Sequence, residues 1–228
     1  GSNNTAVGFE ARKANTTGSN GTSLGYKAGN GVTTGNDNTC IGVESGAYST
    51  VITDGTRNIC IGNYSHTSSP GAYDQIVLGY NVQGSTHSTL TFGHGATETT
   101  CTFGGTSLSA PSDQRLKEEI TTATAGLSFV NDLRPVTFKW KKEKDIPTDL
   151  TGYKEGSETR FKTDTTEHGF IAQEVKTAID AHSEIKDGFD MWSEDDNGRQ
   201  RIGEGSLVPM LVKAIQELSA KVTALENA

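Results

Sequence analysis

A serine and a lysine, Ser112 and Lys117, stand five residues apart near the middle of the chain. A serine hydroxyl becomes a useful nucleophile only when a base removes its proton. A lysine amine can act as that base where desolvation or a neighbouring charge keeps it unprotonated. Glu118 and Glu119 follow directly. If these carboxylates lie close to the amine, they favour its protonated form and oppose this chemistry.

The same segment also has an ordinary explanation as the start of a helix. Ser112 is a good N-cap residue, Asp113 suits the positive end of a helix, and Lys117 is then merely solvated. Leu116 and Ile120 are four residues apart, as on one helix face. These residue types alone favour the helix cap over a nucleophile and its base.

Other residue types that bind metals or form disulfides do not suggest a site. The chain has three cysteines, Cys40, Cys60 and Cys101, without the CxxC spacing of a zinc or redox motif. The acidic residues of 194–198 lack the ligand spacing of an EF-hand, so we interpret them as a turn between short strands. We expect neither a metal nor a cofactor.

The composition of the 228 residues changes near residue 111. The part before it holds 19 of the 27 glycines, four basic and six acidic residues, whereas the rest holds 16 basic and 22 acidic residues. Such a shift usually separates two architectures. We therefore expect one domain over residues 1–111 and a second over residues 112–228.

The overall charge and hydropathy exclude two classes of partner. The net charge of −8 argues against nucleic acid, because binding it depends on neutralising phosphates with Lys and Arg. No run approaches the roughly 18 apolar residues of a membrane helix, and no signal peptide opens the sequence. We expect no membrane insertion.

An apolar residue followed by glycine recurs through the first part, and its glycines are Gly8, Gly25, Gly42, Gly62 and Gly79. Their spacings of 17, 17, 20 and 17 residues predict a β-solenoid in which each repeat makes one turn, here called a rung. Stacked rungs are expected to align an inward apolar ladder of Val7, Leu24, Ile41, Ile61 and Leu78. The 20-residue spacing and the irregular stretch 65–73 suggest a loop insertion. Cys40 and Cys60 hold equivalent places, and we interpret them as small core residues, not a redox pair.

The second part is predicted to be a small α+β domain. A helix is expected over 127–133, a strand over 136–140, a charged loop or hairpin over 141–167, and a helix beginning near 168. Apolar residues near the end are spaced 3, 4, 3, 4 and 3, as in a coiled-coil seam: Val208, Leu211, Ile215, Leu218, Val222 and Leu225.

Two resemblances give these patterns a context. The repeats are similar to those of trimeric adhesin heads and phage tail fibres, which implies a β-roll or β-prism built by three chains. Four segments together resemble the intramolecular chaperone of endosialidases, tailspikes and tail fibres, the peptidase S74 family: 112–117 (SDQRLK), 133–136 (LRPV), 169–175 (GFIAQEV) and 207–218. An aromatic residue often found before the last helix is replaced by Gly203-Glu204-Gly205.

The second resemblance implies that this domain trimerises, guides folding of the preceding β-structure and then cuts itself off. By motif position, Ser112 is the nucleophile and Lys117 its base. Attack by Ser112 within its own chain favours the Pro111–Ser112 bond, because the carbonyl of Pro111 gives a five-membered ring. The Ser112–Asp113 bond stays possible if the nucleophile comes from another chain.

We therefore expect the C-terminal part of a viral tail fibre or tailspike, a homotrimer in the virion whose chaperone domain is released in the host cytoplasm. The fibre part is expected to bind a host cell-surface receptor, a glycan for instance. The alternative is a structural trimerisation clamp without proteolytic activity. A bacterial surface adhesin or a membrane-bound transcription factor fits less well, since neither anchor strands nor a basic DNA-reading surface is seen.

Overall fold

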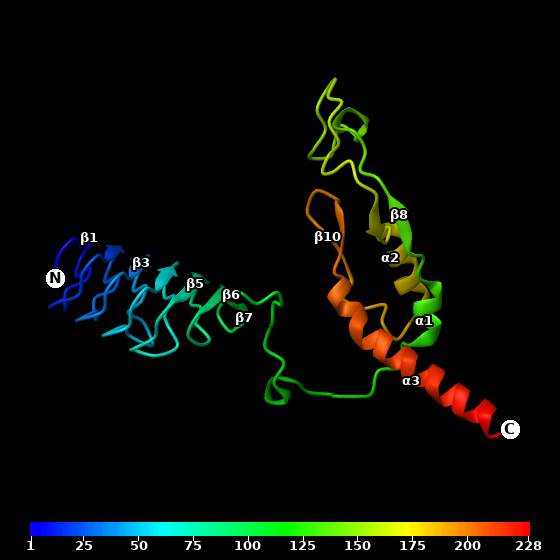
Figure 1. Cartoon of the computed structure of the whole chain (residues 1–228), viewed down its shortest axis with the longest axis horizontal. Coiled ribbons are helices and arrows are strands. Elements are labelled where there is room, and N and C mark those ends of the chain that lie inside the picture. The colour runs from blue at the N-terminus through cyan, green and yellow to red at the C-terminus, as the bar shows by residue number, and fades with distance from the viewer. The chain divides into compact units, whose positions relative to one another are not determined.

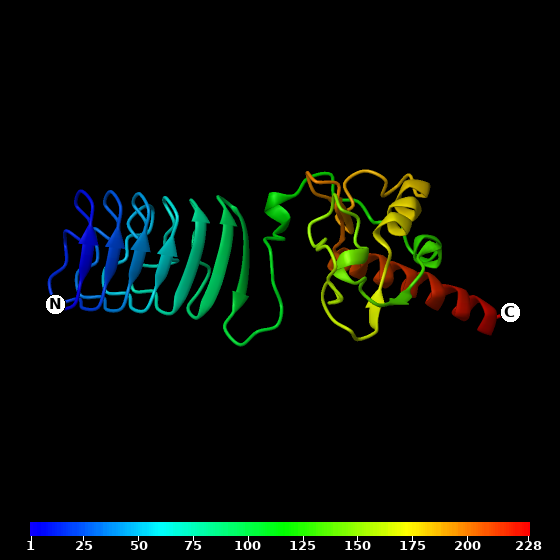
Figure 2. The ribbon, with the colours of Figure 1, turned by 90° about the horizontal axis from the view of Figure 1, so that it is seen from above.

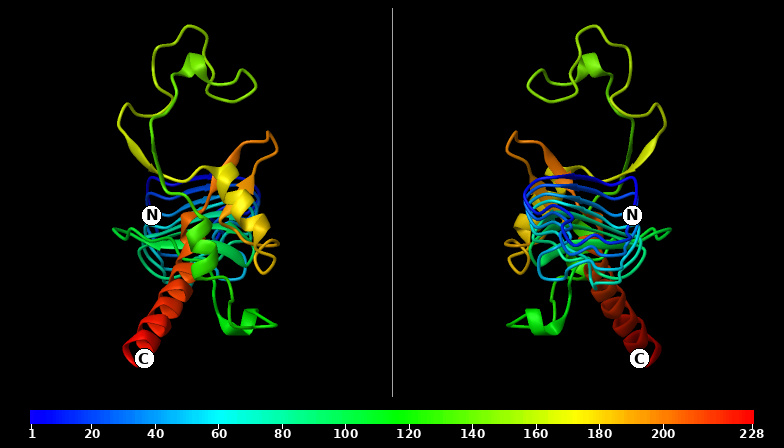
Figure 3. Two further views of the ribbon diagram at one scale, coloured as in Figure 1. Left: turned by 90° about the vertical axis from the view of Figure 1, so that its right-hand side faces the viewer. Right: turned by 90° about the vertical axis from the view of Figure 1, so that its left-hand side faces the viewer.

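The computed structural model describes residues 1–228, which form two compact units, residues 1–118 and residues 119–228. The division lies seven residues beyond the predicted domain boundary, so the segment 112–118 lies with the repeats. Figure 1 and Figure 3 show the repeats as stacked loops of chain in the first unit and helices with short strand pairs in the second.

The first unit is a β-solenoid, as predicted. Six strands pair in parallel in chain order, one from each rung, and Figure 2 shows them side by side. A final strand, β7 (Thr97–Thr102), turns back antiparallel to the sixth. The six are β1 (Thr5–Val7), β2 (Thr22–Leu24), β3 (Thr39–Ile41), β4 (Ile59–Ile61), β5 (Gln75–Tyr80) and β6 (Thr89–His94).

The recurring glycine is required where each strand leaves its rung. Gly25 has φ of +130°, and a Cβ there would lie 2.6 Å from the carbonyl oxygen of Gly42 in the next rung. No side chain fits so short a distance, and L-residues rarely adopt this conformation. The glycine period therefore sets the rung period.

The apolar residue before each glycine forms an aligned ladder, but the prediction that this ladder points inward is wrong. Its residues pair in register, yet Val7 is 57% exposed and Leu24 is 47% exposed. Side chains alternate along a strand, and the middle residue of β2, β3 and β4 points inward. Consequently Ser23, Cys40 and Cys60 are buried, and their neighbours face out.

The solenoid interior is narrow and made of small side chains. Cys40 and Cys60 are in-register neighbours, both fully buried and both free thiols. Burial raises the pKa of Cys40 to about 12 and also raises that of Cys60, so both remain protonated packing residues, as predicted. They pack in one cluster with Ala28, Val32, Ile52, Val77 and Val82.

A ladder of side-chain amides ties the rungs together just before the strands. The Nδ2 atoms of Asn38 and Asn58 donate to the carbonyl oxygens of Gly55 and Ala72 at 2.7 Å, and Asn38 Oδ1 accepts from the Asn58 amide at 3.0 Å. Such bonds satisfy backbone groups that a buried corner would otherwise leave unpaired.

The second rung has glycine, Gly21, where its neighbours carry this asparagine. Arg12 fills the vacated space: it is 5% exposed, and its Nη2 atom donates to the Gly35 carbonyl at 3.1 Å. A Cβ on Gly21 would lie 2.1 Å from Arg12 Nη1. The guanidinium thus replaces the missing amide as donor.

The three extra residues of the 20-residue repeat lie between Gly46 and Ile52. The amide of Ile52 bonds to Gly46, whereas the equivalent bond one rung earlier joins Val32 to Gly29. The stretch 65–73 is not an insertion, contrary to the prediction, because Ser65 and Thr67 are fully buried in a regular rung. Polar residues made this stretch look irregular, but their hydroxyls bond inside the rung.

The second unit is a small α+β domain that ends in a long helix, as predicted. Two antiparallel strand pairs, β8 with β9 and β10 with β11, accompany three α-helices. The elements are α1 (Leu127–Asp132), β8 (Val136–Phe138), β9 (Glu167–Gly169), α2 (Ala172–Ala181), β10 (Trp192–Glu194), β11 (Gln200–Ile202) and α3 (Leu207–Glu226).

One hydrophobic core joins the three helices of this unit. Phe129 of α1 is fully buried among Val175 and Ile179 of α2 and Leu207 and Met210 of α3. Only the first half of α3 takes part in this core. None of the helices combines the length and apolar character needed to cross a bilayer.

Candidate functional site

The structure brings Ser112 and Lys117 into direct contact. The Nζ atom of Lys117 donates a hydrogen bond to Ser112 Oγ at 2.7 Å. This is the separation needed for proton transfer between a nucleophile and its base. Both side chains are exposed in the single chain.

The local backbone, a single 3₁₀ turn over Gln114–Leu116, makes this contact possible. Asp113 is its N-cap, with a carboxylate oxygen that accepts from the Arg115 amide at 2.9 Å. Ser112 therefore precedes the cap, and the explanation of Ser112 as a helix cap is wrong. Lys117 follows the turn with extended backbone, and its side chain reaches back to the serine.

The predicted helix face of Leu116 and Ile120 does not exist, because the turn ends at Leu116. These two side chains are 72% and 61% exposed. One polar cap bond cannot stabilise an isolated helix this short, since helix nucleation is costly without tertiary packing.

The neighbouring acids do not compete for the lysine. Asp113 is paired with Arg115 at 2.5 Å, and this pair lowers the pKa of Asp113. Neither Glu118 nor Glu119 forms an ion pair with Lys117. The serine oxygen is consequently the sole side-chain partner of the lysine amine.

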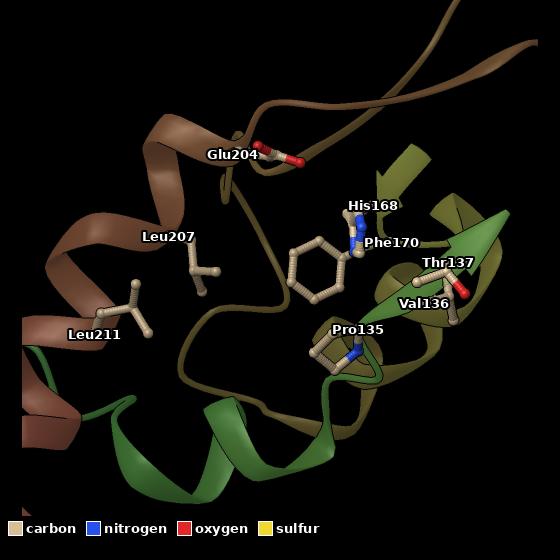
Figure 4. A pocket seen from close by; sticks show the side chains of 9 residues that line it. Pro135, Val136, Thr137, His168, Phe170, Glu204, Leu207 and Leu211 are labelled. Atoms are coloured by element: carbon tan, nitrogen blue, oxygen red, sulfur yellow. The ribbon is translucent and has the colours of Figure 1, made fainter. Parts of the chain in front are cut away.

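A cavity in the second unit collects residues from three of the four segments that resemble the chaperone family. Its volume is about 620 Å³, and Figure 4 shows Phe170 and Pro135 facing Leu207 and Leu211 across it. His168, Glu204, Val136, Thr137 and Gly169 complete the lining. The three segments therefore meet in one local structure. The sequence did not indicate this cavity, since its residues lie up to 76 positions apart.

Two polar contacts hold parts of the second unit together. Arg134 binds Glu174 through two hydrogen bonds, of 2.9 and 2.5 Å, and this pair lowers the pKa of Glu174. Glu217 of α3 accepts from the Leu127 amide at 2.9 Å and so caps α1, which begins after a glycine that has no side chain to do so. A side chain from another helix thus supplies the missing cap.

His182, at the end of α2, joins two acidic residues that the sequence did not single out. Its Nε2 atom lies 2.8 Å from Asp132 Oδ2, and its Nδ1 atom lies 3.2 Å from Glu184 Oε1. The hydrogen bond to Asp132 is the main cause that raises the pKa of His182. The imidazole therefore carries its proton to higher pH than an ordinary histidine and clamps α1 to α2.

This clamp predicts a pH-dependent stability. A histidine whose pKa is raised in the folded state stabilises that state fully below its unfolded pKa, near 6.5, and the stabilisation disappears as pH rises through the raised value. We expect His182→Gln to lower the melting temperature of the full chain at pH 6 by several degrees and to have less effect at pH 9. Calorimetry at the two pH values measures this difference. His168→Gln, at an exposed histidine, is the matched control and should leave the pH dependence intact; equal losses at both pH values for His182→Gln would contradict the clamp.

Comparison with known proteins gives one match. The family model described as chaperone of endosialidase, peptidase S74, matches residues 112–184, which begin at Ser112 and end at the exposed Glu184, three residues after α2. The predicted resemblance is confirmed over these residues. No curated protein and no solved structure matches the chain.

Proposed function

We propose that this chain is the C-terminal part of a viral tail fibre or tailspike, whose second domain trimerises the fibre, assists its folding and cuts itself off. The observation that carries the proposal is the 2.7 Å hydrogen bond between Lys117 and Ser112 at the start of the family match. Ser112 is the nucleophile and Lys117 the base. The reaction is a single self-cleavage.

Exposed apolar residues on α3 support the trimer. The seam residues Ile215 and Leu225 are 64% and 77% exposed, and Val208, Leu211, Leu218 and Val222 are between 39% and 56% exposed. A seam of this spacing is stable when another helix covers it. Three parallel copies would cover it and would align the three solenoids from their C-terminal ends.

Trimerisation would also bury the Ser112–Lys117 pair, which is exposed in a single chain. An amine accepts a proton only in its unprotonated form, which burial favours. Both side chains are exposed in one copy, so neighbouring copies must cover them. Cleavage then follows assembly, because the pair becomes active only when the copies have packed.

The bond cut is Pro111–Ser112 if the serine acts on its own chain. Attack of Ser112 Oγ on the Pro111 carbonyl carbon closes a five-membered ring, the amide nitrogen of Ser112 takes a proton and leaves, and water opens the resulting ester. The lysine takes the proton of the serine hydroxyl and returns it to the leaving amine. Attack from another copy allows Ser112–Asp113 instead.

The fibre domain, residues 1–111, binds a host cell-surface receptor, with a glycan as the expected class. The protein then acts in the virion, and residues 112–228 are released in the host cytoplasm during assembly. The similarity of the repeats to adhesin heads and tail fibres supports this attachment role. Slow, non-local strand pairing explains why such a fibre benefits from a chaperone.

A trimerisation clamp without proteolysis is the second candidate, and the exposure of both Ser112 and Lys117 favours it. Intact mass spectrometry and light scattering on the expressed chain separate the two candidates. Self-cleavage yields fragments 1–111 and 112–228 from a trimer, whereas a clamp yields a trimer of the full 24.2 kDa chain. A monomer would contradict both. We further expect residues 1–110 expressed alone to aggregate; if they fold to the same trimer as the processed chain, the chaperone role is wrong.

A further inference from the structure

A group of aromatic side chains lies on the solenoid surface, beyond the turns at the recurring glycines. This aromatic cluster consists of one residue from each of four successive rungs: Tyr48, Tyr64, Tyr80 and His94. The centroids of successive rings are 4.8, 5.7 and 5.3 Å apart, in that order. Tyr48 and Tyr80 are 46% and 50% exposed, and His94 is exposed as well. The cluster therefore presents a continuous aromatic surface to solvent.

Two of these tyrosines stand where the chain departs from the simplest form of its repeat. Tyr48 lies in the longer stretch between Gly46 and Ile52, which contains the extra residues of the 20-residue repeat. Tyr64 has φ of +63°, a left-handed conformation in which a bulky side chain is uncommon. The next rung has Asn81 at the equivalent place, a residue that adopts this conformation more readily. Stacking of the rungs therefore requires neither tyrosine, and strained residues of this kind cluster at functional sites.

A buried histidine holds the cluster in place. His66 stands where the two preceding rungs have glycine, and it is only 5% exposed. Its ring meets that of Tyr48 edge-on, with the centroids 5.9 Å apart. Its Nδ1 atom donates a 2.9 Å hydrogen bond to the Tyr64 carbonyl oxygen. The two tyrosines are thus positioned before a ligand arrives, and a preorganised surface binds with a smaller loss of conformational freedom.

Polar groups adjoin the rings. Asn63 and Asn81 are exposed and are chain neighbours of Tyr64 and Tyr80. Glu44, which is half-buried, holds the place of Tyr64 in the preceding rung. Aromatic faces beside amides and a carboxylate suit a sugar ring, which has an apolar C–H face and hydroxyls that donate and accept hydrogen bonds at its edge. An apolar partner surface would instead bury these polar groups without hydrogen bonds, at a cost in free energy.

Charge and spacing narrow the class of saccharide. The Glu44 carboxylate and the net charge of −8 repel acidic sugars, so a neutral oligosaccharide is favoured. Neighbouring strands of a sheet lie about 4.8 Å apart, which is close to the length of one sugar unit in an extended oligosaccharide. Successive sugar units can therefore meet the aromatic rings of successive rungs.

We propose that the aromatic cluster binds a neutral oligosaccharide, whose sugar rings pack on Tyr48 and Tyr80 and whose hydroxyls bond to Asn63 and Asn81. This inference rests on the attachment role proposed above and assigns that role a place on the fibre domain. The two exposed tyrosines are expected to contribute most of the affinity, because Tyr64 is half-buried between them.

An array of neutral and sialylated oligosaccharides tests the assignment with the fluorescently labelled full chain. Tyr48→Ala and Tyr80→Ala are each expected to bind neutral sugars about tenfold more weakly than the wild type, because each variant loses one aromatic contact. Tyr48→Phe keeps the ring and should bind nearly as tightly as the wild type. Tyr73→Ala is the matched control, since Tyr73 is 42% exposed and stacks on His87 outside the cluster. It should bind like the wild type.

Light scattering on the same samples distinguishes the outcomes. If Tyr48→Ala and Tyr80→Ala bind neutral sugars as tightly as the wild type, the assigned site is wrong and the attachment role stands. Binding of sialylated sugars alone also overturns this inference and leaves attachment standing. A wild-type chain that binds none of the sugars overturns both the inference and the glycan receptor. Loss of assembly in Tyr48→Ala would show that the cluster is a contact between copies, and an equal loss of binding in Tyr73→Ala would show that the effect is not specific to the cluster; either result overturns the inference.

Discussion

Ser112→Ala and Lys117→Ala are each expected to stop self-cleavage, with the rate falling more than about 10³-fold, as when a nucleophile or its base is removed from a serine hydrolase. The alanine at 112 removes the attacking oxygen, and the alanine at 117 removes the amine that lies 2.7 Å from it. Lys117→Arg should fail as well, because a guanidinium stays protonated and cannot accept the proton. The fraction of uncut chain over time, measured by intact mass, gives the rate.

Assembly provides the control for these variants. All of them should still form trimers by light scattering, because the 3₁₀ turn is capped by Asp113, and neither Ser112 nor Lys117 contributes to the core. The wild-type rate should rise with pH and fall as pH drops, since an ammonium group cannot act as a base. Cleavage at full rate in Lys117→Ala, with no contaminating protease, would show that Lys117 is not the base.

The sequence predicted the solenoid but not the direction of its apolar ladder. A period of 17 residues specifies stacked rungs, and the positive φ of Gly25 shows why the period follows the glycines. Three-residue strands carry too little alternation to distinguish the inward side from the outward side. The buried residues, such as Ser23 and Cys40, are small or polar, so hydropathy ranks the exposed ladder above them.

The candidate site was predicted in part. Family resemblance pointed to Ser112 and Lys117, whereas local residue types favoured a helix cap that the structure assigns to Asp113. The contacts of His182 with Asp132, 50 residues away, could not be predicted, because they depend on how α1 and α2 pack. Short-range patterns identify turns and caps, but side chains that meet across a core leave no spacing signal.

The second large effect is expected from substitutions at Arg12 and Gly21, which should change the stability of the first rungs. The next two rungs carry glycine at the position of Arg12 and asparagine at the position of Gly21: Gly29 with Asn38, and Gly46 with Asn58. Arg12 also has φ of +53°, a left-handed conformation that glycine adopts without strain. Arg12→Gly alone removes the donor to the buried Gly35 carbonyl and leaves a cavity. Relief of the positive φ and removal of two buried guanidinium nitrogens that have no hydrogen-bond partner offset part of this loss, so we expect a net cost of about 1–2 kcal/mol.

Gly21→Asn alone should also destabilise the first rungs, because its Cβ would lie 2.1 Å from the enclosed Arg12 Nη1 atom. The double variant, Arg12→Gly with Gly21→Asn, recreates the pairing of the later rungs and should return stability to within about 1 kcal/mol of the wild type, a coupling of the size measured between residues in contact. Hydrogen exchange of the Arg12 and Thr22 amides, which bond to the next rung, measures this local stability. If the double variant loses as much protection as the two single variants combined, the guanidinium is not a substitute for the missing asparagine.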